Sequence, residues 1–119
     1  MPGIAGIIDF SAEKGSFEHA IKRMTSLLNN MSLCIEETVC DRNVAFGTAR
    51  LKDYPYNSLI AEDEDSIIAF WGYLWDENEL KHLLESGKDL ASQHVSHVIL
   101  KLYRDKGAEA VCKLNGRFV

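Results

Sequence analysis

The sequence predicts an α+β domain in which helices lie on a mostly antiparallel sheet. Three observations lead to this class. A short β-branched apolar run opens the chain, several short strand-like runs follow the first predicted helix, and amphipathic helical spacing dominates the last third. Strands joined by short turns pair antiparallel, and helices then cover a face of such a sheet. With 119 residues the chain has room for one domain with one core.

The first strand is predicted at residues 3–10, where β-branched isoleucines indicate burial on both faces. A turn at residues 11–16 leads into a helix. Ser16 can cap the start of this helix, and Asn29 and Asn30 suit its end. Its apolar side chains recur three or four residues apart, at Phe17, Ile21, Met24, Leu27, Leu28 and Met31.

Alternation of side chains predicts a hairpin in the next segment. Residues 33–40 carry two glutamates among β-branched residues, which is typical of a half-exposed strand. Residues 41–43 form the predicted turn, and residues 44–49 form the second strand. Gly47 in that strand would let another backbone come close. Residues 54–57 then interrupt the pattern.

Two more strands are predicted before the chain turns helical. A short strand at residues 58–61 and a charged turn at residues 62–65 precede a very apolar strand at residues 66–74. The next helix starts at Asp76, with Glu79 three residues later as in a capping box, and ends at Gly87.

The last third predicts one longer helix, one short helix and the start of a strand. The longer helix covers residues 93–106, and Gly107 ends it. A short helix at residues 108–114 carries Val111 and Leu114, and a strand begins at residue 117 after a turn. The apolar stripe of the longer helix consists of Val95, Val98, Ile99 and Leu102.

Composition and charge exclude several classes of protein. A net charge of −5 with scattered basic residues argues against nucleic-acid binding. No apolar run reaches the ~18–20 residues that span a bilayer, and the N-terminus lacks the features of a signal peptide. The three cysteines, Cys34, Cys40 and Cys112, are an odd number for a secreted disulfide framework. Reduced, buried cysteines in a cytoplasmic protein are the expectation.

Four segments in order carry a resemblance to a known family. They are residues 3–7 (GIAGI), residues 43–51 (NVAFGTARL), residues 70–74 (FWGYL) before a Glu-Leu pair, and residues 98–118, which contain VILKLY and LNGRF. This series resembles class-II glutamine amidotransferase domains of the kind that open asparagine synthetases. The resemblance covers nearly the whole chain, with residues 1–119 corresponding to the N-terminal part of a type-2 domain.

The resemblance implies a fold and a chemistry. The fold is that of N-terminal-nucleophile hydrolases, with two antiparallel sheets between layers of helices, of which this chain would supply part. In the family, a cysteine directly after the initiator Met attacks glutamine, and its own amine serves as the base. An Asn side chain and a backbone N–H hold the oxyanion, while Arg and Asp grip the substrate. A synthetase domain then uses ATP and Mg²⁺, so no cofactor is expected on this chain.

The chemical positions of the family are mostly replaced here. Pro2 stands at the nucleophile position and offers no thiol, so no catalytic residue is assigned. Trp71 replaces the oxyanion Asn, whereas Gly72 is kept and its N–H could still point inward. Val95 replaces the Asp that binds the glutamine amine. Arg50 and Gly72 remain as vestigial substrate-binding positions.

Each of these residues also has a simpler interpretation. Arg50 is either a carboxylate ligand or a surface or sheet-edge arginine. Pro2 would expose a secondary amine if Met1 were removed, and this amine could act as an N-terminal base or nucleophile. That is a further functional alternative for the chain. Trp71, Tyr73 and Trp75 alternate on one strand face and predict buried core or a partner contact, with a ligand platform as the alternative.

Metal, redox and phosphate sites are not predicted. His94 and His97 lie three apart and His82 lies elsewhere, whereas zinc needs three or four ligands at definite spacing. Cys34 and Cys40 share one strand face without forming a CxxC pair. No phosphate-binding loop of the GxxxxGK[ST] type is present.

The sequence therefore predicts a degenerate amidotransferase-like domain without glutaminase activity. It would serve as a scaffold beside a downstream or separate ATP-dependent synthetase domain, in a protein related to asparagine synthetase. Lasso-peptide macrolactam synthetases are one such group, because they join a carboxylate to an amine without glutamine and would keep the domain only as a scaffold. The alternative is a stand-alone interaction module that forms a homo-oligomer or pairs through an open sheet edge.

Overall fold

The computed structural model describes residues 2–11, 17–29, 33–56, 58–83 and 94–119. It confirms the α+β class, with small antiparallel sheets and flanking helices. The chain divides into two compact units, Met1–Pro55 and Tyr56–Val119, and each is described by itself. The predicted features at residues 11–16, 30–31 and 84–93 lie wholly or mostly outside the described residues, including the Ser16 cap and the Gly87 helix end.

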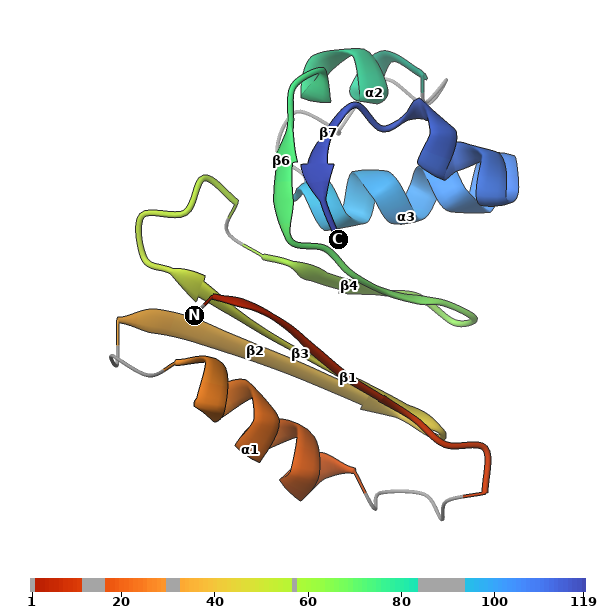
Figure 1. Cartoon of the computed structure of the whole chain (residues 1–119). Helices are drawn as coiled ribbons and strands as arrows, with labels where there is room; N and C mark the ends of the chain where they lie inside the picture. The colour runs from red at the N-terminus through yellow and green to blue at the C-terminus, as the bar shows by residue number, and fades with distance from the viewer. Residues whose placement is uncertain (1, 12–16, 30–32, 57, 84–93) are drawn as a thin grey trace. The chain divides into compact units, whose positions relative to one another are not determined.

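The described residues of the first unit form a three-stranded antiparallel sheet with one helix on it (Figure 1). Its elements are β1 (Gly3–Ile8), α1 (Glu18–Leu28), β2 (Cys34–Asp41) and β3 (Val44–Leu51), and β3 lies between β1 and β2. The predicted hairpin is confirmed: Asp41 pairs with Val44 across a turn at Arg42 and Asn43. Arg42 has a φ of 33°, the left-handed conformation that such tight hairpins use.

Fewer side chains of helix α1 are buried against the sheet than the spacing of its apolar residues predicts. Ile21 and Thr25 are fully buried, whereas Met24 and Leu27 are exposed. The buried side chains lie four residues apart and face Gly47 of β3. Gly47 does permit a close approach, but of a helix side chain rather than of a backbone. Asn29 forms the predicted end of the helix, where its N–H donates to the Ser26 carbonyl.

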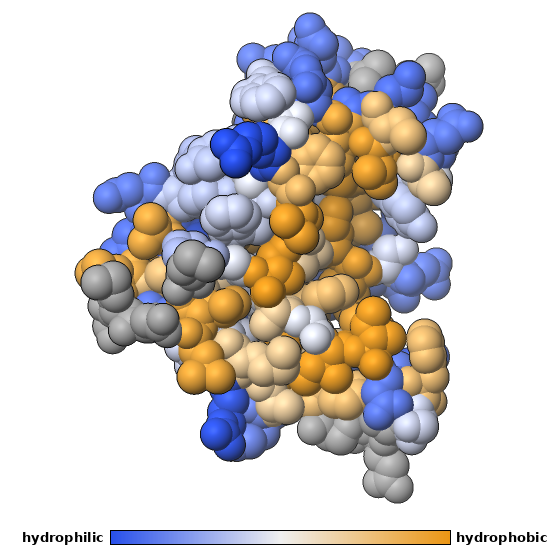
Figure 2. Space-filling view, in the orientation of Figure 1, coloured by the Kyte–Doolittle hydropathy of each residue, from blue (hydrophilic) through white to orange (hydrophobic). Residues whose placement is uncertain are grey.

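The prediction that the first strand is buried on both faces is wrong. β1 is an edge strand that pairs only with β3 among the described strands, and its side chains are mostly half-buried. Ile8 is 62% exposed, and Phe10 just after the strand is also exposed. Apolar side chains at the surface of the molecule are visible in Figure 2. β-branched composition predicts the strand correctly, but burial depends on what covers each face.

In its described residues, the second unit contains two two-stranded sheets and three helices. Its elements are β4 (Ile60–Glu62), β5 (Ile67–Ala69), β6 (Gly72–Leu74), α2 (Glu77–Leu83), α3 (Val95–Lys106), the 3₁₀ helix η2 (Gly107–Lys113) and β7 (Gly116–Phe118). β4 pairs with β5, and β6 pairs with β7, both antiparallel. None of the described helices is long and apolar enough to cross a membrane.

The single strand predicted at residues 66–74 is in fact two strands in two sheets. The Phe70 N–H donates to the Leu59 carbonyl at 2.8 Å, which continues the β4–β5 pairing. One residue later, Trp71 and Val119 exchange two backbone hydrogen bonds, which start the β6–β7 pairing. The strand therefore changes partner between Phe70 and Trp71, a switch that an apolar run does not reveal.

The core of the second unit lies under α3. The predicted stripe of this helix is confirmed, because Val95, Val98, Ile99 and Leu102 are all buried. Gly107 ends the helix with a φ of 63°, as its position predicts. The short helix after it is a 3₁₀ helix, in which Ala110 is the buried residue and Val111 is exposed.

The charged turn at residues 62–65 is confirmed as the connection between β4 and β5. The Asp63 carboxylate accepts the backbone N–H groups of Asp65 and Ser66 at 3.0 and 2.9 Å. It also lies 3.5 Å from the guanidinium of Arg104 on α3. One carboxylate thus shapes the turn and ties it to the helix.

Candidate functional site

Pro2, the residue before β1, lies level with Arg50 of the neighbouring strand β3. Gly3 of β1 pairs with Ala49 of β3 in an antiparallel register. Continuing that register by one residue sets Pro2 beside Arg50. Side chains directly opposite each other on paired strands project from the same face of the sheet. The structure therefore brings together two of the positions that the sequence singled out as candidate site residues.

Arg50 is not at the surface or at a sheet edge, which corrects the simpler interpretation. It belongs to the central strand, opposite Ile35 of β2, and is only 7% exposed. Gly47 faces α1, so the alternation of β3 turns Arg50 to the other face of the sheet. A guanidinium keeps its charge under burial, and burying a charge is costly. A buried central arginine is thus a stronger candidate for a binding role than an edge arginine.

Gly72 has a backbone that only glycine adopts easily. Its φ is 144°, and a Cβ placed there would lie 2.8 Å from the Cβ of Phe118 on β7. Trp71 and Val119 form a hydrogen-bonded pair, so the next pair, Gly72 and Phe118, is a non-hydrogen-bonded one. The Gly72 N–H therefore points to the side of β6 opposite β7.

Tyr56 lies on that same side of β6. Its hydroxyl oxygen accepts the Leu74 N–H at 3.1 Å, and its ring packs edge-on against Phe70 with centroids 5.8 Å apart. The amides of Gly72 and Leu74 thus share one edge of the strand. Sequence reasoning missed Tyr56, whose only signal is an aromatic residue directly after Pro55.

Trp71, Tyr73 and Trp75, in and beside β6, are not core residues, so the predicted burial is wrong, whereas the predicted partner contact and the alternative of a ligand platform stay predictions. Trp71 is half-buried, Tyr73 is 49% exposed and Trp75 is 66% exposed. They do share one strand face, as predicted, because Gly72 and Leu74 take the buried face. Phe118 fills that buried face and stacks on Phe70 at a centroid distance of 6.1 Å.

Val95 is a core residue at the first position of α3. It is only 2% exposed, and the neighbouring Ser96 is also buried. The Ser96 hydroxyl lies 3.3 and 3.4 Å from the carbonyls of Ser58 and Ile60 and donates to them. The position that would carry the family's amine-binding Asp here anchors the helix to the segment around β4.

The histidines and cysteines do not form a metal site in the described part of the chain. His94 and His97 are exposed, with ring centroids 6.0 Å apart. No group of three or more His, Cys, Asp or Glu residues suited to a metal ion occurs among the described residues. The cysteines are free, but Cys40 and Cys112 are exposed, so the prediction of buried cysteines is wrong for these two.

Cys34 and Cys40 lie on the α1 side of β2, on one face as predicted. On the same face, the Glu36 carboxylate accepts hydrogen bonds from Ser26 in α1 and from Asn29, the residue directly after α1. Partial desolvation of the Cys40 thiol raises its pKa, and the Glu18 carboxylate raises the pKa further, while the Lys22 ammonium lowers it. A raised pKa lowers the fraction of Cys40 that is thiolate, which is the reactive form of the thiol.

The candidate site residues thus fall into two sets. Pro2 and Arg50 lie together in the first unit, whereas Trp71, Gly72 and Val95 belong to the second. A family model described as a glutamine amidotransferase domain matches residues 1–119. No curated protein matches the chain.

Proposed function

The chain belongs to the glutamine amidotransferase domain family, and from this premise we propose that it is a degenerate member that lacks glutaminase activity. The strongest support is that the β1–β3 register, continued by one residue beyond Gly3 and Ala49, sets Pro2 beside Arg50. Arg50 stands where the family grips the substrate carboxylate, and the residue beside it offers no thiol. A substrate held there would meet no nucleophile.

Two further positions support the loss of chemistry. Trp71 supplies a bulky indole where a short amide would donate to the oxyanion. Val95 is buried and uncharged where the family holds the glutamine ammonium. Gly72 is the one oxyanion position of the family that this chain keeps, and its backbone N–H points away from β7.

We propose that the domain serves as a scaffold for an ATP-dependent amide-forming partner related to asparagine synthetase. Core and backbone positions such as Gly47, Gly72 and Val98 keep the fold, while the chemical positions are lost. This pattern fits a synthetase that takes its amine directly, as a macrolactam-forming enzyme does. ATP and Mg²⁺ would bind the synthetase domain. The three free cysteines support a cytoplasmic location.

A glutaminase assay tests the proposal. We expect no ammonia release from glutamine by the natural sequence or by Pro2→Cys. Pro2→Cys combined with Trp71→Asn and Val95→Asp is the stricter test, with circular dichroism to confirm folding. Steady ammonia release by the natural sequence that only changes at Pro2 abolish would overturn the proposal.

Mass spectrometry of the N-terminus tests the alternative chemistry of Pro2. A retained Met1 excludes a free proline amine outright. If Met1 is removed, reaction with an aldehyde substrate and borohydride trapping shows whether the secondary amine reacts. A trapped adduct at Pro2 that forms faster than on a short Pro-Gly-Ile peptide would favour the amine.

The scaffold role has its own test. We expect a synthetase protein with an ATP pyrophosphate loop to be encoded in the same reading frame or beside it, and to bind this domain in a pull-down. The exposed Trp75→Ala and the buried-site Arg50→Met variants would show which surface the partner uses. If no adenylating enzyme is encoded in the same reading frame or in the adjacent genes, the scaffold role is contradicted.

A second candidate is an interaction module that pairs through the β1 edge. β1 carries no charged residue, whereas the β2 edge carries Glu36 and Glu37, which disfavour pairing with another strand. Light scattering would then show a dimer that Ile8→Lys disrupts. A monomer at high protein concentration would exclude this candidate.

A further inference from the structure

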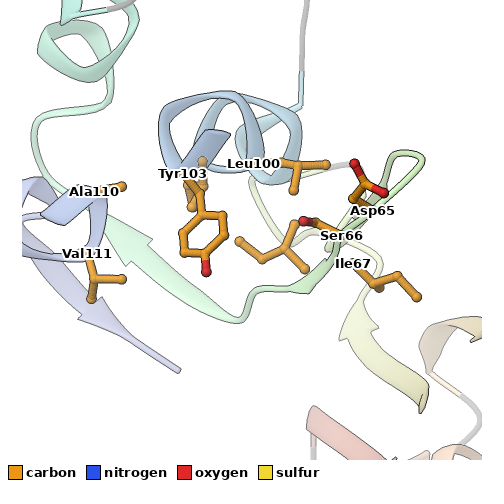
Figure 3. A pocket seen from close by; sticks show the side chains of 9 residues that line it. Asp65, Ser66, Ile67, Leu100, Tyr103, Ala110 and Val111 are labelled. Carbon is orange, nitrogen blue, oxygen red and sulfur yellow. The ribbon is translucent and has the colours of Figure 1, made fainter. Parts of the chain in front are cut away.

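A pocket of about 440 Å³ lies within the second unit, and its lining includes none of the candidate site residues Trp71, Gly72 and Val95. Its walls are apolar and come from three elements: Ile67 and Ile68 from β5, Ile99 and Leu100 from α3, and Val111 from η2. In Figure 3, helix α3 closes one side of the pocket and β5 another. A volume of several hundred Å³ with mostly apolar walls is typical of small-molecule sites.

Three polar side chains line the same pocket. In Figure 3, the Tyr103 ring stands between Val111 on one side and Asp65 and Ser66 on the other. The Asp65 carboxylate and the hydroxyls of Ser66 and Tyr103 make no hydrogen bond or ion pair with any described residue. The Asp65 backbone N–H donates to Asp63, so the turn is held without the Asp65 carboxylate.

The charge of the pocket selects one class of ligand. Its lining includes one carboxylate and no basic side chain. In the acidic turn, the Asp63 carboxylate lies 3.5 Å from the Arg104 guanidinium, and the exposed Asp65 is the acidic residue that lines the pocket. The whole chain carries a net charge of −5, which disfavours anions. A carboxylate accepts hydrogen bonds only, so its partner must be a donor.

We propose that this pocket binds a small primary amine with an apolar body. The apolar body would lie among the isoleucines, Leu100 and Val111. The ammonium would donate to the Asp65 carboxylate and the Ser66 hydroxyl, which are adjacent in the chain. The Tyr103 ring would stack on the apolar body and offer its face to the cation. This site is independent of the proposed function.

Amide NMR titrations with three matched ligands test the proposal. The ligands are 4-phenylbutan-1-amine, 4-phenylbutan-1-ol and 4-phenylbutyrate, which share the apolar body and differ in the polar end. The amine is expected to shift the signals of Ile67, Ile99 and Val111 and to bind more tightly than the alcohol. The carboxylate is expected to leave these signals in place.

Asp65→Asn and Glu64→Gln are matched variants that each remove one negative charge from the same turn. Asp65→Asn is expected to weaken amine binding about two- to fivefold, because the ion pair between the ammonium and Asp65 is partly solvated. Alcohol binding is expected to stay unchanged in this variant. Glu64→Gln, which does not line the pocket, is expected to leave both unchanged. Val111→Trp is expected to block both ligands by filling the pocket mouth.

Three results would overturn the proposal. One is equal affinity for the amine and the alcohol. Another is an equal loss of amine binding in Asp65→Asn and Glu64→Gln, which would indicate a diffuse charge effect. The third is a set of shifted signals that lies elsewhere in the chain. If Val111→Trp does not fold, the paired Asp65 and Glu64 variants decide the question.

Discussion

Thr25 of α1 lies directly over Gly47 of β3, with no room for a side chain at the glycine. A Cβ at Gly47 would lie 3.1 Å from the Thr25 Cβ and 3.4 Å from Cγ1 of Ile21, and it would clash with the Thr25 hydroxyl. That hydroxyl donates to the Ile21 carbonyl at 2.8 Å, which fixes its position. The helix therefore sits as close to the sheet as glycine permits.

Replacing Gly47 with alanine is expected to destabilise the domain by about 1–3 kcal/mol, because the helix must move away from the sheet. Urea unfolding measures this loss. Gly3→Ala is the control, since nothing lies within 4 Å of a Cβ there. Combining Gly47→Ala with Thr25→Ala is expected to cost less than the sum of the single changes. Equal unfolding midpoints for Gly47→Ala and Gly3→Ala would disprove the close packing.

Replacing Tyr56 with phenylalanine is expected to cost about 1–2 kcal/mol, because the buried Leu74 N–H loses its acceptor. Thermal unfolding followed by circular dichroism measures the change. Tyr103→Phe removes an exposed hydroxyl instead and should shift stability by less than about 0.5 kcal/mol. If the two variants unfold alike, the hydroxyl of Tyr56 does not support β6.

Cys40 is expected to react slowly with iodoacetamide, because its pKa is raised by burial and by the Glu18 carboxylate. The thiolate is the reactive form, so the alkylation rate should rise at a higher pH in folded protein than in urea-unfolded protein. Mass spectrometry of the Cys40 peptide follows the rate.

Glu18→Gln should move the pH dependence of Cys40 alkylation back toward lower pH, since one source of the raised pKa of the thiol is removed. Lys22→Gln should move it the other way, because the Lys22 ammonium lowers the pKa of the thiol. Identical curves for folded and unfolded protein would argue against any influence of the helix on Cys40.

Part of the site was accessible from sequence because it depends on motif position. The expectation that Pro2 takes the position of the family nucleophile, and Trp71 and Val95 those of the oxyanion and amine-binding residues, comes from the resemblance of short segments. The burial of Arg50 could not be predicted from these segments. Its neighbours in sequence alternate as any strand does, and only the order of strands places it in the middle of the sheet.

The sequence by itself determined the α+β class, the hairpin at Arg42 and Asn43, the stripe of α3 and its end at Gly107. These features depend on local periodicity and on backbone angles that few residues adopt. The tertiary structure alone decided that the strand changes partner after Phe70, that Thr25 is buried while Leu27 is exposed, and that Pro2 lies level with Arg50. The physical reason is that periodicity shows which side chains share a face, whereas only long-range pairing decides what covers that face.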